Sequence, residues 1–207
     1  DQNMLSQGQY FNPIVPLYLF PRGEDFTPYR MYERYDEGRQ LMTQHWPYGE
    51  MGMAMQNPYW IINRNMFNND RDRYMANAGL KYKVFDWMDI SGRVRIDNAN
   101  TRHTKKLYAS TDAKFAQSKG YYGDRKDVDK QLYADFLVNI NKRFNDFDLT
   151  ANVGASIQDV SMDYVGAEGQ LSMIPNFFTL HNVDLGANNS RIKQDGWKEQ
   201  TQSVFAS

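Results

Sequence analysis

Residues 74–98 read YMANAGLKYKVFDWMDISGRVRIDN, and this stretch decides the expected fold. In its two arms, 74–85 and 88–98, apolar or small residues alternate with polar ones. Only Asp86 and Trp87 separate the arms, which predicts a tight turn between two antiparallel strands. Alternation with a period of two over roughly 10 residues, with one apolar and one polar face, is typical of strands in a transmembrane β-barrel.

A second stretch repeats this pattern, with arms at 132–144 and 147–158 on either side of Asn145 and Asp146. We expect the apolar face of both hairpins to meet lipid, because Lys or Arg at a mid-membrane lipid-facing position costs roughly 2–4 kcal/mol. The positions expected to face lipid are Ala76, Ala78, Leu80, Ile90, Val94, Phe136, Val138, Val153 and Ala155. Those expected to face the barrel lumen are Asn77, Lys81, Arg93, Arg95, Asn139 and Asn152.

The composition favours a barrel over an ordinary soluble domain. Of the 207 residues 41% are hydrophobic, including 14 Tyr, 12 Phe, 11 Met and 4 Trp, yet the mean hydropathy is −0.74. A water-filled barrel reconciles these values, because only every second strand residue must be apolar and the loops are polar. The balance of 24 Lys and Arg against 25 Asp and Glu predicts no nucleic-acid binding, which needs a basic excess. The absence of Cys excludes a disulfide framework, a thiolate zinc site and a catalytic thiol.

No run of apolar residues approaches the roughly 18 that a membrane-spanning helix needs, so no such helix is expected. Residues 1–7 lack the basic and apolar regions of a signal peptide. Residues 203–207 read as the middle of a strand. We therefore expect the chain to be an internal part of a longer protein.

Two regions are expected along the chain. Residues 1–73 are rich in Pro and aromatic residues and predict a long extracellular loop region with short helical turns near 31–42, because Pro interrupts a strand ladder. Residues 74–207 predict part of a barrel wall. This wall comprises hairpins at 74–99 and 132–158, loops at 100–131 and 159–199, and the start of a further strand at 200–207. Short turns alternating with long loops are typical of outer-membrane barrels, in which the short turns are periplasmic.

Such a sheet cannot close on itself. Only four complete strands are readable, whereas membrane barrels start at about eight. An open sheet edge in lipid leaves backbone N–H and C=O groups unsatisfied, at several kcal/mol each. We therefore expect residues 200–207 to pair with 147–160, and both outer edges to continue into other strands.

Several motifs carry a resemblance to a known family. They are Asn57-Pro58-Tyr59-Trp60, residues 73–82 and 86–94, Gly120-Tyr121-Tyr122, Ala134-Asp135-Phe136-Leu137, Ile174-Pro175-Asn176-Phe177-Phe178 and residues 203–207. In their order and spacing they resemble SusC/RagA-type TonB-dependent outer-membrane transporters. The resemblance implies part of a plugged barrel of about 22 strands in the outer membrane of a Gram-negative bacterium. It also implies uptake of glycans or peptides, a SusD-like surface lipoprotein partner, and coupling to the TonB machinery through parts of the transporter outside this chain.

Six aromatic residues in the expected loops are candidates for substrate contact, because aromatic faces stack on the apolar C–H patches of sugar rings. They are Trp46, Tyr48, Tyr59, Trp60, Tyr121 and Tyr122. The same residues could instead pack within the loops or against a partner lipoprotein. A basic patch on the polar face of the first hairpin, Lys81, Lys83, Arg93 and Arg95, either forms salt bridges in the barrel wall or guides an acidic substrate.

No catalytic chemistry is expected. His45, His103 and His181 lie in separate segments without metal-ligand spacing, so no metal site is predicted. Serine-hydrolase and P-loop motifs are absent from the sequence, so we expect neither an enzyme nor a cofactor. The alternative to a transporter is a soluble β-rich carbohydrate- or protein-binding module, built on an antiparallel sheet with one wet face.

Overall fold

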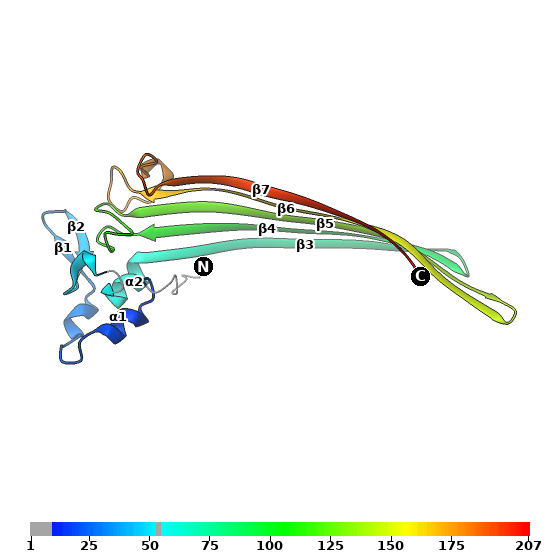
Figure 1. Cartoon of the computed structure of the whole chain (residues 1–207), viewed down its shortest axis with the longest axis horizontal. Helices are drawn as coiled ribbons and strands as arrows, with labels where there is room; N and C mark the ends of the chain where they lie inside the picture. The colour runs from blue at the N-terminus through cyan, green and yellow to red at the C-terminus, as the bar shows by residue number, and fades with distance from the viewer. Residues whose placement is uncertain (1–9, 53–54) are drawn as a thin grey trace. The chain divides into compact units, whose positions relative to one another are not determined.

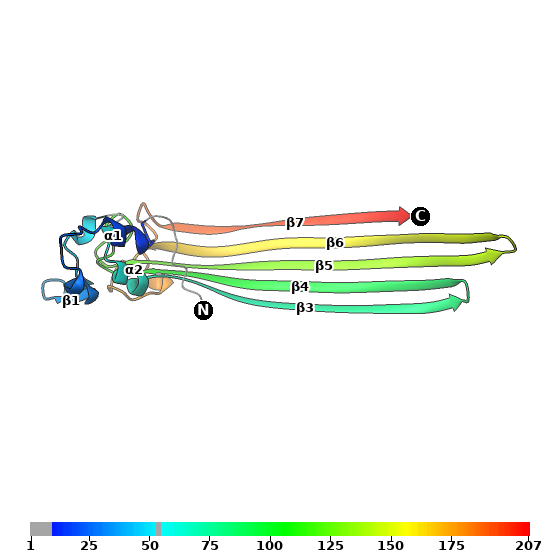
Figure 2. The ribbon, with the colours of Figure 1, turned by 90° about the horizontal axis from the view of Figure 1, so that it is seen from below.

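The computed structural model describes residues 10–52 and 55–207, which form an all-β, antiparallel fold, as predicted. Five long strands make one sheet in the order β3-β4-β5-β6-β7, which is also their order along the chain (Figures 1 and 2). Their bounds are β3 Asn65–Phe85, β4 Met88–Leu107, β5 Tyr121–Phe144, β6 Phe147–Gln170 and β7 Arg191–Ala206. Each strand therefore pairs with its sequence neighbours, without a crossover.

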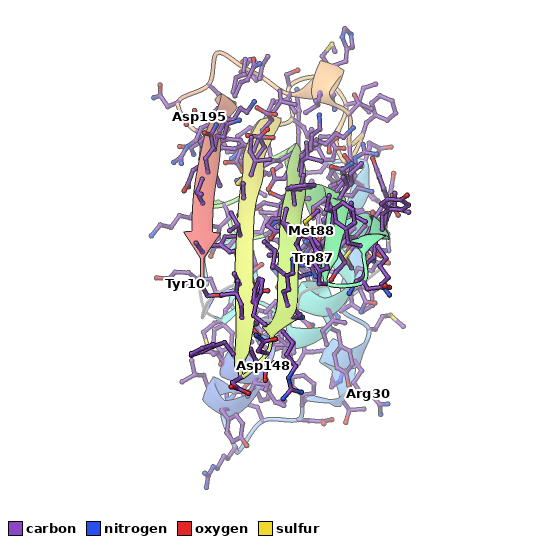
Figure 3. All side chains as sticks on the ribbon, turned by 90° about the vertical axis from the view of Figure 1, so that its right-hand side faces the viewer. Tyr10, Arg30, Trp87, Met88, Asp148 and Asp195 are labelled. Atoms are coloured by element: carbon purple, nitrogen blue, oxygen red, sulfur yellow. The ribbon has the colours of Figure 1, made fainter. Side chains whose placement is uncertain are left out.

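The two tight turns lie where the alternation predicts them. Asp86 and Trp87 alone connect β3 to β4, and Asn145 and Asp146 alone connect β5 to β6. Asn145 has a φ of 45°, a left-handed conformation that Asn tolerates better than most residues. Trp87 stacks on Phe85, with ring centroids 5.2 Å apart, and its position at the end of the hairpin can be followed in Figure 3. Both predicted hairpins are confirmed.

The strands extend well beyond their predicted ends. Strand β4 continues to Leu107, β5 starts at Tyr121, β6 runs to Gln170 and β7 starts at Arg191. The expected loops at 100–131 and 159–199 are thus reduced to 108–120 and 171–190. Residues 99–106 read ANTRHTKK and show no alternation of apolar and polar residues that would predict a strand. The hydrogen bonds between strands are made by the backbone, so they do not require such alternation.

Residues 10–73 also differ from the expected loop. Residues 65–73 belong to β3, and residues 33–44 form a β-hairpin in the place of the expected helical turns. In this hairpin β1, Glu33–Asp36, pairs with β2, Leu41–Gln44, in the register Glu33↔Gln44. The remaining elements are the helices α1 Ile14–Leu19 and α2 Pro58–Arg64 and the short 3-10 helices η1 Thr27–Arg30 and η2 Gly49–Met51.

The chain divides into two compact units. Unit 1 comprises residues up to 70 together with 102–126 and 165–194, and unit 2 comprises 71–101, 127–164 and 195–207. Among its described residues, unit 1 has two small hydrophobic cores. The first contains Phe11, Leu107, Ala116 and Tyr121, and the second contains Tyr122, Leu171 and Val183. The loop that leads to β7 carries the 3-10 helix η4, Leu180–Asn182, and packs against the second core through Phe178.

Unit 2 has almost no interior. Among the described residues, Ala99 is its only buried hydrophobic side chain. Its large apolar side chains are exposed instead, with Leu80 at 77% and Val204 at 84%. A soluble sheet buries its apolar face against a second layer, and within the described residues unit 2 has no such layer.

The sheet is open, as predicted. Strands β3 and β7 are its outer strands, and no ladder joins them in the part of the chain that the structure describes. The end of β7 pairs with β6, because Asn152 and Ser207 exchange two backbone hydrogen bonds of 2.8 and 2.9 Å. This confirms the expected pairing of 200–207 with 147–160. No helix within 10–52 and 55–207 has the length and apolar character that crossing a membrane requires.

Candidate functional site

Four of the six candidate aromatic residues are interior side chains of unit 1. Trp60 is fully buried, and its Nε1 donates a hydrogen bond of 3.0 Å to Thr111 Oγ1. Tyr121 and Tyr122 belong to the two hydrophobic cores, and Trp46 is also buried. Packing within the unit accounts for these four rings, which matches the alternative that the sequence leaves open.

Tyr48 and Tyr59 remain accessible, at 37% and 36% exposure. They lie at the rim of an aromatic cluster centred on Trp46, whose ring centroid lies 5.3 Å from that of Tyr29 and 5.7 Å from that of Tyr48. Tyr59 joins the same cluster through Phe26, at 6.2 Å. Two accessible rings on a packed aromatic base form a surface suited to stacking on a ligand or a protein partner.

Asn57 positions the segment that carries Tyr59 and Trp60. Its Oδ1 accepts a hydrogen bond from Tyr59 N–H at 2.9 Å, and this caps α2, while Pro58 occupies the first turn, where no donor is needed. Its Nδ2 donates to the backbone oxygens of Tyr29 and His45 at 2.8 and 3.0 Å. The fully buried amide thus joins three segments of the loop region, a role that the Asn-Pro motif alone does not reveal.

Unit 1 also contains a pocket that the sequence does not predict. It has a volume of about 230 Å³ and is lined by all five long strands. The lining residues are Phe67, Asn69, His103, Thr104, Lys105, Gly123, Asp124, Arg125, Gly166, Ala167, Glu168, Arg191 and Lys193. All of them lie in stretches expected to be loops, so their common position on the sheet is recognised only from the full length of the strands.

Two glycines without side chains, Gly123 and Gly166, line this pocket and leave space in it. A Cβ at Gly166 would lie 2.7 Å from the Cβ of Arg125, and a Cβ at Gly123 would lie 3.0 Å from the Cβ of Glu168. Any residue larger than glycine at position 123 or 166 would crowd the side chain of Glu168 or Arg125 on the neighbouring strand. Lys105 also borders Gly123, with its Cβ 3.6 Å from the same built position.

The polar groups of the pocket interact closely. The Lys105 ammonium lies 4.5 Å from the centroid of the Tyr121 ring, within range of a cation–π interaction. Burial lowers the pKa of Lys105; Glu168 opposes this shift, and the positive charge of Arg191 adds to it. Burial, helped by the nearby Glu168 carboxylate, raises the pKa of Tyr121. These charged and aromatic groups thus lie close together in one small volume.

The basic patch of the first hairpin is paired within unit 2. Lys81 Nζ lies 2.9 Å from Asp89 Oδ1, and Arg93 Nη2 lies 2.8 Å from Asp135 Oδ2. Asp89 also accepts a hydrogen bond of 3.0 Å from Asn139. These contacts match the interpretation of the patch as salt bridges in the sheet wall.

Within residues 10–52 and 55–207, no group of three His, Asp or Glu side chains is arranged to hold a metal ion. No family model matches the chain, and no curated protein is significantly similar to it.

Proposed function

We propose that the chain forms part of the wall and outer loops of a TonB-dependent outer-membrane importer of the SusC/RagA type. The observation that carries this proposal is the open sheet of unit 2, with exposed apolar side chains on one face and ion pairs on the other. The transporter class rests on the motif resemblance, and the membrane setting rests on this sheet.

Among the described residues, the apolar face of unit 2 lacks the covering layer that a soluble protein would place on it. Exposed apolar side chains come from every strand of unit 2 and include Tyr74, Leu80, Tyr82, Val94, Ile96, Leu132, Phe136, Leu149, Val153, Ile157 and Val204. Soluble monomers rarely expose contiguous apolar patches larger than a few hundred Å². Lipid is the solvent that such a face fits, since alternating lipid-facing and lumen-facing residues define a membrane strand.

The distribution of charge on this face supports a membrane band. At the end of the strands near the tight turns, Lys142 lies between two aromatic rings. Its ammonium is 4.7 Å from the centroid of the Trp87 ring and 4.9 Å from that of the Phe144 ring. At the other end Lys130, Asp159 and Lys198 line one small pocket with Ile96 and Leu132. From Leu132 to Phe144 the strand covers about 40 Å, or about 30 Å in height at the usual barrel tilt. This suffices for an apolar band of about 25 Å with an aromatic girdle.

The outer strands support a larger assembly. In lipid, every unpaired backbone group of β3 and β7 would cost several kcal/mol. Neighbouring strands of the same transporter would satisfy these groups. The chain on its own would then be a structural part of the importer, without catalysis, and the energy for transport would come from the TonB machinery through other parts of the protein.

The accessible rings Tyr48 and Tyr59 favour a contact role for the loop region. They would face a SusD-like surface lipoprotein or a glycan or peptide substrate. A soluble β-rich binding module is the second candidate, favoured by the two packed cores and the pocket of unit 1. The uncovered face of unit 2 argues against it.

Fractionation and detergent dependence test the proposal. A polypeptide that carries this chain should sediment with outer membranes, resist extraction by salt, and dissolve only in detergent. A matched sample in plain buffer should aggregate. A monodisperse, folded monomer in plain buffer would reject the membrane proposal and favour the soluble binding module.

A further inference from the structure

The pocket of unit 1 divides into two chemically different sides. Strands β3 and β4 contribute the neutral hydrogen-bonding side chains Asn69 and His103, next to the ring of Phe67. Strands β5 and β7 contribute the cations Arg125, Arg191 and Lys193. His103 Nδ1 lies 2.6 Å from Asn69 Oδ1, so the neutral side is held in a defined arrangement.

The charges in the pocket are unbalanced. Lys105, Arg191 and Lys193 line the pocket, whereas among the residues that the structure describes the lining acids are Asp124 and Glu168. Asp124 is held by Arg102, outside the lining, through contacts of 2.7 and 2.9 Å. Burial is the main reason that the pKa of Lys105 is lowered, and the like charge of Arg191 adds to this shift against the opposing effect of Glu168. A bound anion would offset the like charges of Lys105 and Arg191, and Arg presents the planar donors that suit an oxyanion.

The size of the pocket limits the ligand. Sites for drug-sized ligands measure about 300–1,000 Å³, so a pocket of about 230 Å³ takes one small group or one unit of a longer chain. A group that satisfies both sides needs a negative charge at one end and several hydroxyls at the other. An aromatic ring beside the hydroxyl side suits the apolar face of a sugar.

We infer that this pocket binds one acidic sugar unit, with its carboxylate toward Arg191 and Lys193 and its hydroxyls toward Asn69 and His103. That such a sugar is a transported substrate rests on the proposed function, whereas its binding does not. Arg125 and Lys105 would form the inner end of the cationic side.

Binding can be measured by calorimetric titration of the purified full chain, in detergent if it requires one. Glucuronate is the probe, glucose is the neutral match, and inorganic phosphate tests charge alone. Glucuronate should bind at least about tenfold more tightly than glucose, since the loss of a charge-assisted contact costs about 1.4 kcal/mol or more, a factor of ten. It should also bind more tightly than phosphate, which has the charge but no sugar hydroxyls for the neutral side of the pocket.

The variants Arg191→Gln and Lys193→Gln should each weaken glucuronate binding about tenfold without unfolding the chain, because both side chains are exposed. Lys126→Gln is the matched control, since Lys126 follows Arg125 but does not line the pocket, and its affinity should stay within about twofold. Equal binding of glucose and glucuronate, equal binding of phosphate, unchanged affinity in both pocket variants, or no binding of glucuronate would overturn the inference. A water-soluble chain that still binds glucuronate would refute the transporter and leave the acidic-sugar site standing.

Discussion

The ring of Phe205 occupies the space that a side chain at position 154 would take. A Cβ built on Gly154 falls 2.5 Å from two carbons of the Phe205 ring and 2.9 Å from the backbone oxygen of Phe136. Strand β7 is thus packed onto β6 by an aromatic ring that covers a glycine, a device that pins the register of strands.

Gly154→Ala should therefore destabilise unit 2 by about 1–3 kcal/mol, the usual cost of overpacking. Gly79→Ala is the control, because a Cβ there meets Arg93 at an ordinary distance of 3.4 Å. Thermal unfolding of the detergent-solubilised protein measures both. Equal melting temperatures for the two variants would show that the Phe205 contact does not constrain the sheet.

Charge on the apolar face should block assembly. Val94 is an exposed residue of that face, and Arg at a mid-membrane lipid-facing site costs about 2–4 kcal/mol. We expect Val94→Arg to lower the amount of folded protein in the outer membrane, whereas Arg95→Ser, one residue along the strand and on the polar face, should not. Heat-modified mobility on gels reports the folded fraction. Equal tolerance of the two changes would contradict the assignment of the faces.

Asn182 organises the loop between β6 and β7. Its Nδ2 donates to the backbone oxygens of Ile174 and Phe177 at 2.7 and 2.8 Å, and its Oδ1 accepts from the backbone N–H groups of Met173 and Ile174 at 3.0 and 3.1 Å. Asn182→Ala removes four bonds from a buried site and should cost about 2–4 kcal/mol.

Hydrogen exchange locates this effect. Residues 173–177 should lose protection in Asn182→Ala and keep it in Asn189→Ala, where the side chain is exposed. If both variants exchange like the parent protein, the Asn182 bonds do not hold the loop.

Alkaline pH should loosen unit 1 through Tyr121. The pKa of this phenol is raised by burial, so the folded state holds its proton more tightly than the unfolded state does. The associated stability is fully present below the ordinary pKa of about 10 and is lost as the pH rises toward the higher folded value. The free energy of unfolding should therefore fall above about pH 10.

In the Tyr121→Phe variant the free energy of unfolding should fall less above about pH 10 than in the parent protein. The Tyr18→Phe variant is the control, because it removes the phenol of an exposed tyrosine. Denaturant unfolding at a series of alkaline pH values measures the slope. A slope that is identical in the parent and in Tyr121→Phe would rule out this linkage.

The sequence alone located the two tight turns and the inner halves of four strands. There Asp86-Trp87 and Asn145-Asp146 interrupt a regular alternation of apolar and polar residues. This alternation is a local property of the sequence, so it predicts strands without any knowledge of the tertiary structure. The open edges and the pairing of β7 with β6 also followed, because so few strands cannot close a barrel.

The tertiary structure alone decided how far the strands run and which side chains meet. Residues 99–106 and 123–131 have no regular apolar and polar alternation, so backbone pairing and contacts such as Arg102 with Asp124 hold them, and neither leaves a periodic signal. Trp60 and Tyr121 read as ligand-stacking rings because aromatic residues in loops and in cores are chemically identical. Only packing against Thr111 and Leu107 distinguishes the two cases. The charged pocket, too, could be found only from the tertiary structure. Its residues come from five strands, and the pairing of these strands brings Phe67 and Arg191 to one site.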